Sequence, residues 1–75
     1  MRIYLELYEI ASEGSAEEPD FVRIDVTEWD KDNVDEAVRL LQQHARESYA
    51  SYTLQFHYCR HDANQPCTAV VLEAK

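Results

Sequence analysis

The segment from Asp32 to Tyr49 is the one convincing amphipathic helix of the chain, and it constrains the fold more than any other feature. Its apolar residues recur at the i, i+3, i+4, i+7 spacing that places side chains on one helical face. These residues are Val34, Ala37, Val38, Leu41, Ala45 and Tyr49. A helix with one apolar stripe must bury that stripe against another element. The rest of the chain is therefore expected to supply a packing surface.

The start of this helix carries a capping signal, whereas its end does not. Asn33 and Glu36 have the spacing of a capping box, and Asp32 with Asp35 is the alternative shifted by one residue. No Gly or Pro marks the end. We expect the helix to stop between residues 47 and 51.

Four other segments alternate apolar and polar residues with the period of two that is typical of half-buried strands. They are residues 2–10, 21–27, 52–60 and 67–73. Residues 11–20 contain the only glycine and several carboxylates, and predict a flexible acidic loop. Residues 61–66 predict a turn. Trp29 is expected to cover the core near the start of the helix.

The element order predicts one α+β domain over residues 1–75, a ββαββ unit with a four-stranded sheet and one helix packed on one face. This order resembles the β-grasp arrangement of ubiquitin-like and immunoglobulin-binding domains, without any shared motif. The resemblance implies a parallel central pair formed by the first and last strands. Segments 21–27 and 52–60 would then be the sheet edges. A plain antiparallel meander is the alternative topology.

The net charge of −8 restricts the classes of partner. Nucleic-acid binding needs a basic footprint, so direct contact with nucleic acid is not expected, and anionic membranes are disfavoured for the same reason. The N-terminal segment alternates with glutamate instead of forming a signal sequence, which favours a cytoplasmic protein. A basic protein partner is allowed, although acidity can also serve solubility alone.

Acidic and tyrosine side chains are the predicted partner-binding residues. Tyrosine offers a large contact area at low entropic cost. The set comprises Tyr4, Tyr8, Glu13, Glu17, Glu18, Asp20, Glu28, Asp30, Asp32, Asp35 and Glu36. Tyr4 and Tyr8 are expected on the open sheet face, beside Ala69 and Val71. The same tyrosines could also serve cross-strand packing alone.

The segment around the second predicted turn gathers the two cysteines of the chain and two of its histidines, which are the residue types that most often carry redox or metal chemistry. If the hairpin centres on Ala63, Cys59 and Cys67 stand opposite each other, with His57 on the same face. Three interpretations compete, namely a cross-strand disulfide, a metal site that adds His61, and ordinary reduced thiols. The cysteine spacing lacks the usual pattern of structural zinc sites. We therefore expect no metal and no cofactor; if a metal did bind, its candidate ligands would be His57, Cys59, His61 and Cys67.

The favoured function is a small, acidic, non-enzymatic protein-binding module without catalytic residues. A sharper version is an inhibitor that mimics nucleic-acid phosphates and blocks a basic protein. In size, acidity and compactness the chain is similar to small phage-borne inhibitors, including anti-CRISPR proteins, with no motif in common. The alternatives are a thiol- or metal-dependent regulatory domain and a structural domain that forms a homodimer.

Overall fold

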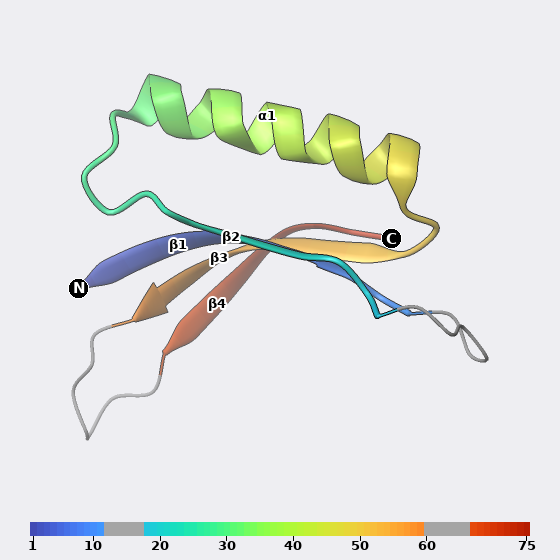
Figure 1. The fold of residues 1–75 in the computed structure, drawn as a ribbon. Coiled ribbons are helices and arrows are strands. Elements are labelled where there is room, and N and C mark those ends of the chain that lie inside the picture. The colour runs from blue at the N-terminus through green and yellow to red at the C-terminus, as the bar shows by residue number, and fades with distance from the viewer. Residues whose placement is uncertain (12–17, 60–66) are drawn as a thin grey trace.

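The predicted ββαββ order is confirmed in the computed structural model, which describes residues 1–11, 18–59 and 67–75 (Figure 1). The elements are β1 (Arg2–Glu9), β2 (Phe21–Asp25), α1 (Lys31–Ser48), β3 (Tyr52–Cys59) and β4 (Thr68–Ala74). Each predicted strand and the predicted helix is present, with bounds within about two residues of those expected. The acidic loop centre and the second turn fall on residues 12–17 and 60–66, outside the described residues.

The sheet is antiparallel throughout, with strand order β2-β1-β3-β4. The β-grasp arrangement is therefore wrong in detail, because β3 rather than β4 pairs with β1. The short connection at residues 49–51 brings the chain from the end of α1 back under the helix, beside β1. There Tyr52 and Leu54 become fully buried, whereas Val70 and Val71 of β4 stay about half exposed. The segment predicted as an edge, residues 52–60, is thus central, and β4 is an edge with β2.

The core lies between α1 and the central strands, with the helix lying along one face of the sheet (Figure 1). Alternation along β1 and β3 sends every second side chain toward the helix. The buried apolar residues are Leu5, Leu7, Val26, Ala45, Tyr49, Tyr52 and Leu54, with the helical stripe packed against them. The expected half-buried character is therefore confirmed for β1 and β3, whereas β4 contributes no residue to this core.

The predicted capping box is wrong. The helix begins at Lys31, with Asp30 as the N-cap residue, so Asn33 lies inside the first turns. Glu36 bonds forward to Arg39 at 2.6 Å instead of reaching back to the N-cap. The Asp30 side chain makes no capping hydrogen bond. The helix ends at Ser48, within the expected range, and the Tyr49 N–H donates to the carbonyl of Ala45.

No helix in the described part of the chain combines the length and apolarity needed to cross a bilayer.

Candidate functional site

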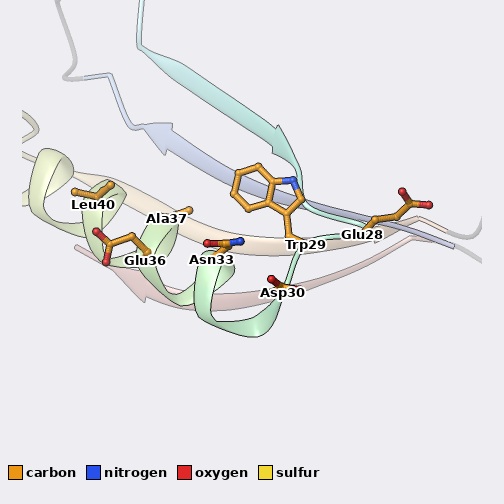
Figure 2. Close-up of a pocket in the computed structure, with 7 residues that line it drawn as sticks. All are labelled: Glu28, Trp29, Asp30, Asn33, Glu36, Ala37 and Leu40. Atoms are coloured by element: carbon orange, nitrogen blue, oxygen red, sulfur yellow. The ribbon is translucent and has the colours of Figure 1, made fainter.

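A groove lies beside the first turns of α1. It has a volume of about 530 Å³ and is lined by Glu28, Trp29, Asp30, Asn33, Glu36, Ala37 and Leu40. Figure 2 shows the indole of Trp29 standing beside the helix, with Asn33 and Ala37 facing it. The groove thus combines an aromatic wall, an aliphatic wall and a carboxylate rim.

Trp29 does not cover the core, contrary to the sequence-based expectation. The backbone N–H of Trp29 donates to the backbone carbonyl of Val26 at 3.1 Å, which closes a turn after the end of β2. This turn sends Val26 into the core at 3% exposure and directs Trp29 outward at 45% exposure. Leu40, two helical turns along α1, is 51% exposed. Leu40 was expected to widen the apolar stripe of the helix, but it lies at the groove instead. No pattern in the sequence indicated this groove.

The acidic residues near the groove differ in how far their charge is already balanced. Asp35 is bound by Lys31 at 3.0 Å, and Glu36 by Arg39. Glu28 and Asp30 pair with no cation among residues 1–11, 18–59 and 67–75. Carboxylates at a helix start are also stabilised by the positive end of the helix dipole. The free negative charge at the groove therefore comes chiefly from Glu28 and Asp30.

The other predicted acidic residues do not join this groove. Asp20 accepts a hydrogen bond from the Tyr49 hydroxyl at 3.1 Å, which ties the start of β2 to the end of the helix. Glu18 and Asp32 are exposed without lining the groove. Glu13 and Glu17 lie outside the described residues. The predicted acidic residues are thus spread over the surface, and one of them, Asp20, makes a hydrogen bond that joins two elements of the fold.

Tyr4 and Tyr8 lie on the open sheet face, as expected, but their neighbours differ from those expected. Tyr4 pairs with Asp25 and His57 in the sheet, and not with Ala69 or Val71 of β4. The guanidinium of Arg23 covers the Tyr4 ring at 3.7 Å, and Tyr8 stacks on Phe21 at 4.7 Å. Both tyrosines therefore have cross-strand packing partners.

Glu6 is the centre of the open face, although the sequence did not single it out. It is only 2% exposed and accepts hydrogen bonds from Tyr8, Gln55 and His57 at 3.0 to 3.2 Å. Arg23 adds an ion pair at 3.2 Å. Burial alone would raise the pKa of this carboxyl, but the bonds from Gln55, Tyr8 and His57 outweigh burial and lower it. Alternation predicted only that Glu6 points away from the helix.

Cys59 and Cys67 stand opposite each other as predicted, with their sulfur atoms 3.0 Å apart. Both are free thiols. His57 lies beside them, and its Nδ1 is 3.0 Å from Oε1 of Glu6. The pKa of His57 is raised by its bonds to Cys67 and Glu6. The fourth candidate, His61, lies outside the described residues.

The two thiols are not equivalent. Cys59 is buried at 5% exposure, whereas Cys67 is exposed. The pKa of Cys67 is lowered because the Cys59 thiol and the His57 imidazolium both stabilise its thiolate. The pKa of Cys59 is raised, first because it is bonded to that thiolate and second by burial. This site therefore combines an exposed, ionisable thiol with a buried neighbour.

A soft metal ion is the cofactor that these side chains could hold, since the ligand atoms of His57, Cys59 and Cys67 lie within 4.8 Å of one another. Two thiolates on one tetrahedral zinc ion are about 3.8 Å apart, given Zn–S bonds near 2.3 Å. The observed 3.0 Å is shorter. The described residues thus fit a zinc ion less closely than they fit a thiol pair.

Comparison of the chain with protein-family models, with curated proteins and with solved structures found no match.

Proposed function

We propose that the protein is a non-enzymatic binding module that holds a basic segment of a protein partner in the groove beside Trp29. The observation that carries this proposal is that the exposed Trp29 and the exposed Leu40 line the same carboxylate-rimmed groove. A small domain with a limited core gains stability by burying its only tryptophan. Its exposure here is explained if a partner completes the burial.

The chemistry of the groove defines the partner segment. Tryptophan is enriched among the residues that dominate binding energy, because its large rigid surface can be fully desolvated. Glu28 and Asp30 add unbalanced negative charge at the rim, which attracts Lys or Arg and speeds encounter. The expected ligand is therefore a segment in which an apolar side chain is flanked by basic residues.

Solubility is the competing explanation of the acidity. Asp35 and Glu36 are balanced by their own helix partners, and Asp32 lies at the positive end of the helix. These three residues need no external ligand. Solubility does not explain why Trp29 and Leu40 share the same hollow, so substitutions at these two positions separate the two explanations.

Selection from a random peptide library on the immobilised full chain tests the proposal. We expect peptides with an apolar residue between Lys and Arg, which bind W29A and L40A at least tenfold more weakly. V71A is the matched control, because Val71 is 56% exposed but lies on β4, away from the groove. Enrichment of acidic peptides, or equal binding to W29A, would contradict the proposal.

Mimicry of nucleic-acid phosphates is the narrower form of this proposal. It is supported by Glu28 and Asp30, whose charge no described cation balances. If the natural partner is a nucleic-acid-binding protein, a short DNA duplex should compete with this chain for it. The charge-neutral variant E28Q/D30N should then no longer prevent the partner from binding the DNA duplex. The variant E47Q, at the far end of α1, should still prevent it.

A further inference from the structure

The thiol pair on the open sheet face lies at a separation from which a disulfide can form without backbone movement. Tyr58 pairs with Thr68, so the next pair along the hairpin brings Cys59 opposite Cys67. Directly opposed residues of antiparallel strands have Cα atoms about 4.5–5.5 Å apart, inside the range for disulfides. The sulfur atoms are already 3.0 Å apart. Closing the bond needs only about 1 Å of further approach.

Exposure separates the two thiols into an attacking and a resolving position. Cys67 is exposed and can reach an external disulfide, whereas Cys59 is buried at 5% exposure behind it. A buried thiol does not meet a bulky reagent, but it can attack a neighbouring sulfur that does. This asymmetry is what a two-step thiol–disulfide exchange requires.

Charged groups around the pair favour a thiolate at Cys67. His57 lies between Cys67 and the buried carboxylate of Glu6. This carboxylate holds the imidazole ring by a hydrogen bond to Nδ1 of His57. Arg23, on β2, binds the other oxygen of Glu6 and also favours negative charge on the sulfurs. The Cys67 thiolate and the His57 imidazolium therefore stabilise each other, and the pKa of Cys67 falls below its ordinary value.

We propose that Cys67 and Cys59 are a redox-active dithiol that exchanges with an external disulfide. The Cys67 thiolate attacks one sulfur of the disulfide RSSR, forms a mixed disulfide and releases RS⁻. Cys59 then attacks the Sγ of Cys67, breaks the bond between that sulfur and SR, and passes its proton to the leaving group, which departs as RSH. The first RS⁻ takes up the proton that the Cys67 thiol released when it ionised. The chain loses two electrons and forms the Cys59–Cys67 bond, while RSSR is reduced to two RSH. His57 positions and stabilises the attacking thiolate, and Glu6 positions His57.

Glutathione buffers test this step on the full chain, freed of metal by a chelator. The reduced protein is equilibrated with glutathione and its disulfide, quenched with acid, alkylated and weighed by mass spectrometry. We expect the Cys59–Cys67 disulfide to form as the proportion of glutathione disulfide in the buffer rises. It should be reduced again by excess glutathione. Failure to form it in glutathione disulfide, or a stoichiometric zinc ion that is retained by the cysteines and blocks oxidation, would overturn the proposal.

Single-cysteine variants assign the roles. C59S should accumulate a mixed disulfide between Cys67 and glutathione, whereas C67S should form the corresponding adduct at Cys59 at least tenfold more slowly. In the wild-type chain, peptide mapping after brief alkylation should show Cys67 modified first, which keeps the test valid if a variant unfolds. Equal rates at the two cysteines would overturn the assignment.

The pH dependence of Cys67 alkylation tests whether His57 and Glu6 position and stabilise the Cys67 thiolate. The alkylation rate of Cys67 should rise with pH around a midpoint below the ordinary thiol range near 8.5. H57Q and E6Q should move that midpoint upward, while H44Q, at a histidine on the helix away from the pair, should leave it in place. An unchanged midpoint in both H57Q and E6Q would exclude a role in stabilising the thiolate.

Discussion

At the scale of single residues, Glu6 shows how a charged side chain can be buried on a face that looks solvent-facing in the sequence. It lies between Leu5 and Leu7, and alternation places it on the side away from the helix. Donors from the neighbouring strands then cover it to 2% exposure. Those donors are remote in sequence, so no local pattern could have identified this cluster.

Replacing Glu6 by Gln should destabilise the fold by about 1–3 kcal/mol, because buried donors lose a charged acceptor. The lowered pKa of Glu6 means that its contribution exists above about pH 4.5 and is lost as pH falls through the folded value. The raised pKa of His57 means that its contribution exists below about pH 6.5 and is lost as pH rises through the folded value.

The difference in unfolding free energy between wild type and E6Q should therefore be largest near pH 5–6, where Glu6 is ionised and His57 is protonated. Urea unfolding at several pH values measures this difference. E47Q is the control, because Glu47 is exposed near the end of α1. A difference that is independent of pH would mean that Glu6 acts through packing alone.

At the scale of elements, the strands and the helix follow from periodicity, but the helix start does not. The apolar stripe of α1 packs on one face of the sheet as predicted, although the strands beneath it are β1 and β3 and not the first and last strands. Several Asp and Asn residues compete as N-caps between residues 30 and 35, and local preference does not rank them. The turn from Val26 to Trp29 decides the outcome, since it places Asp30 where the helix begins.

The substitution N33A tests the observed helix start. As an N-cap, Asn33 would cost about 1 kcal/mol of stability when replaced by Ala. Inside the helix, where the structure places it, the same change should be neutral or stabilising by up to about 0.7 kcal/mol, because Ala is the better helix former. Thermal unfolding distinguishes the two signs. A clear loss of stability would contradict a helix that begins at Lys31.

At the scale of the whole molecule, the two-layer architecture was predictable but the strand order was not. One striped helix and four alternating strands favour helix on sheet, whichever strand pairs with β1. The choice of β3 depends on how deeply Tyr52 and Leu54 are buried relative to Val70 and Val71. All four segments carry comparable alternation, so the sequence cannot rank them. The groove was missed for a similar reason, because exposure of Trp29 is a tertiary property.

Matched leucine substitutions test this layer arrangement. L54A should lose about 2–5 kcal/mol, because Leu54 is fully buried under the helix. L40A should change stability by less than about 0.5 kcal/mol, because Leu40 is 51% exposed. Denaturant unfolding of both variants compares the same chemical change at two depths. Equal losses would contradict the packing of α1 described above.

We expect a homodimer, if the chain forms one, to pair through the edge strand β4. Val70, Val71 and Leu72 are 37–56% exposed on it. Self-association stays a prediction, and light scattering of the wild-type chain over a concentration series decides it.

The most direct test of the proposed function uses the fluorescence of Trp29, which is the only tryptophan of the chain and lies in the groove itself. The titrant is a synthetic peptide with Phe between Lys and Arg, and its acidic counterpart with Glu is the control. We predict that the basic peptide shifts the emission to shorter wavelength, with an affinity that weakens as salt rises. The acidic peptide should leave the emission unchanged. An unchanged emission with the basic peptide and with every library-selected peptide would contradict a binding function at this groove.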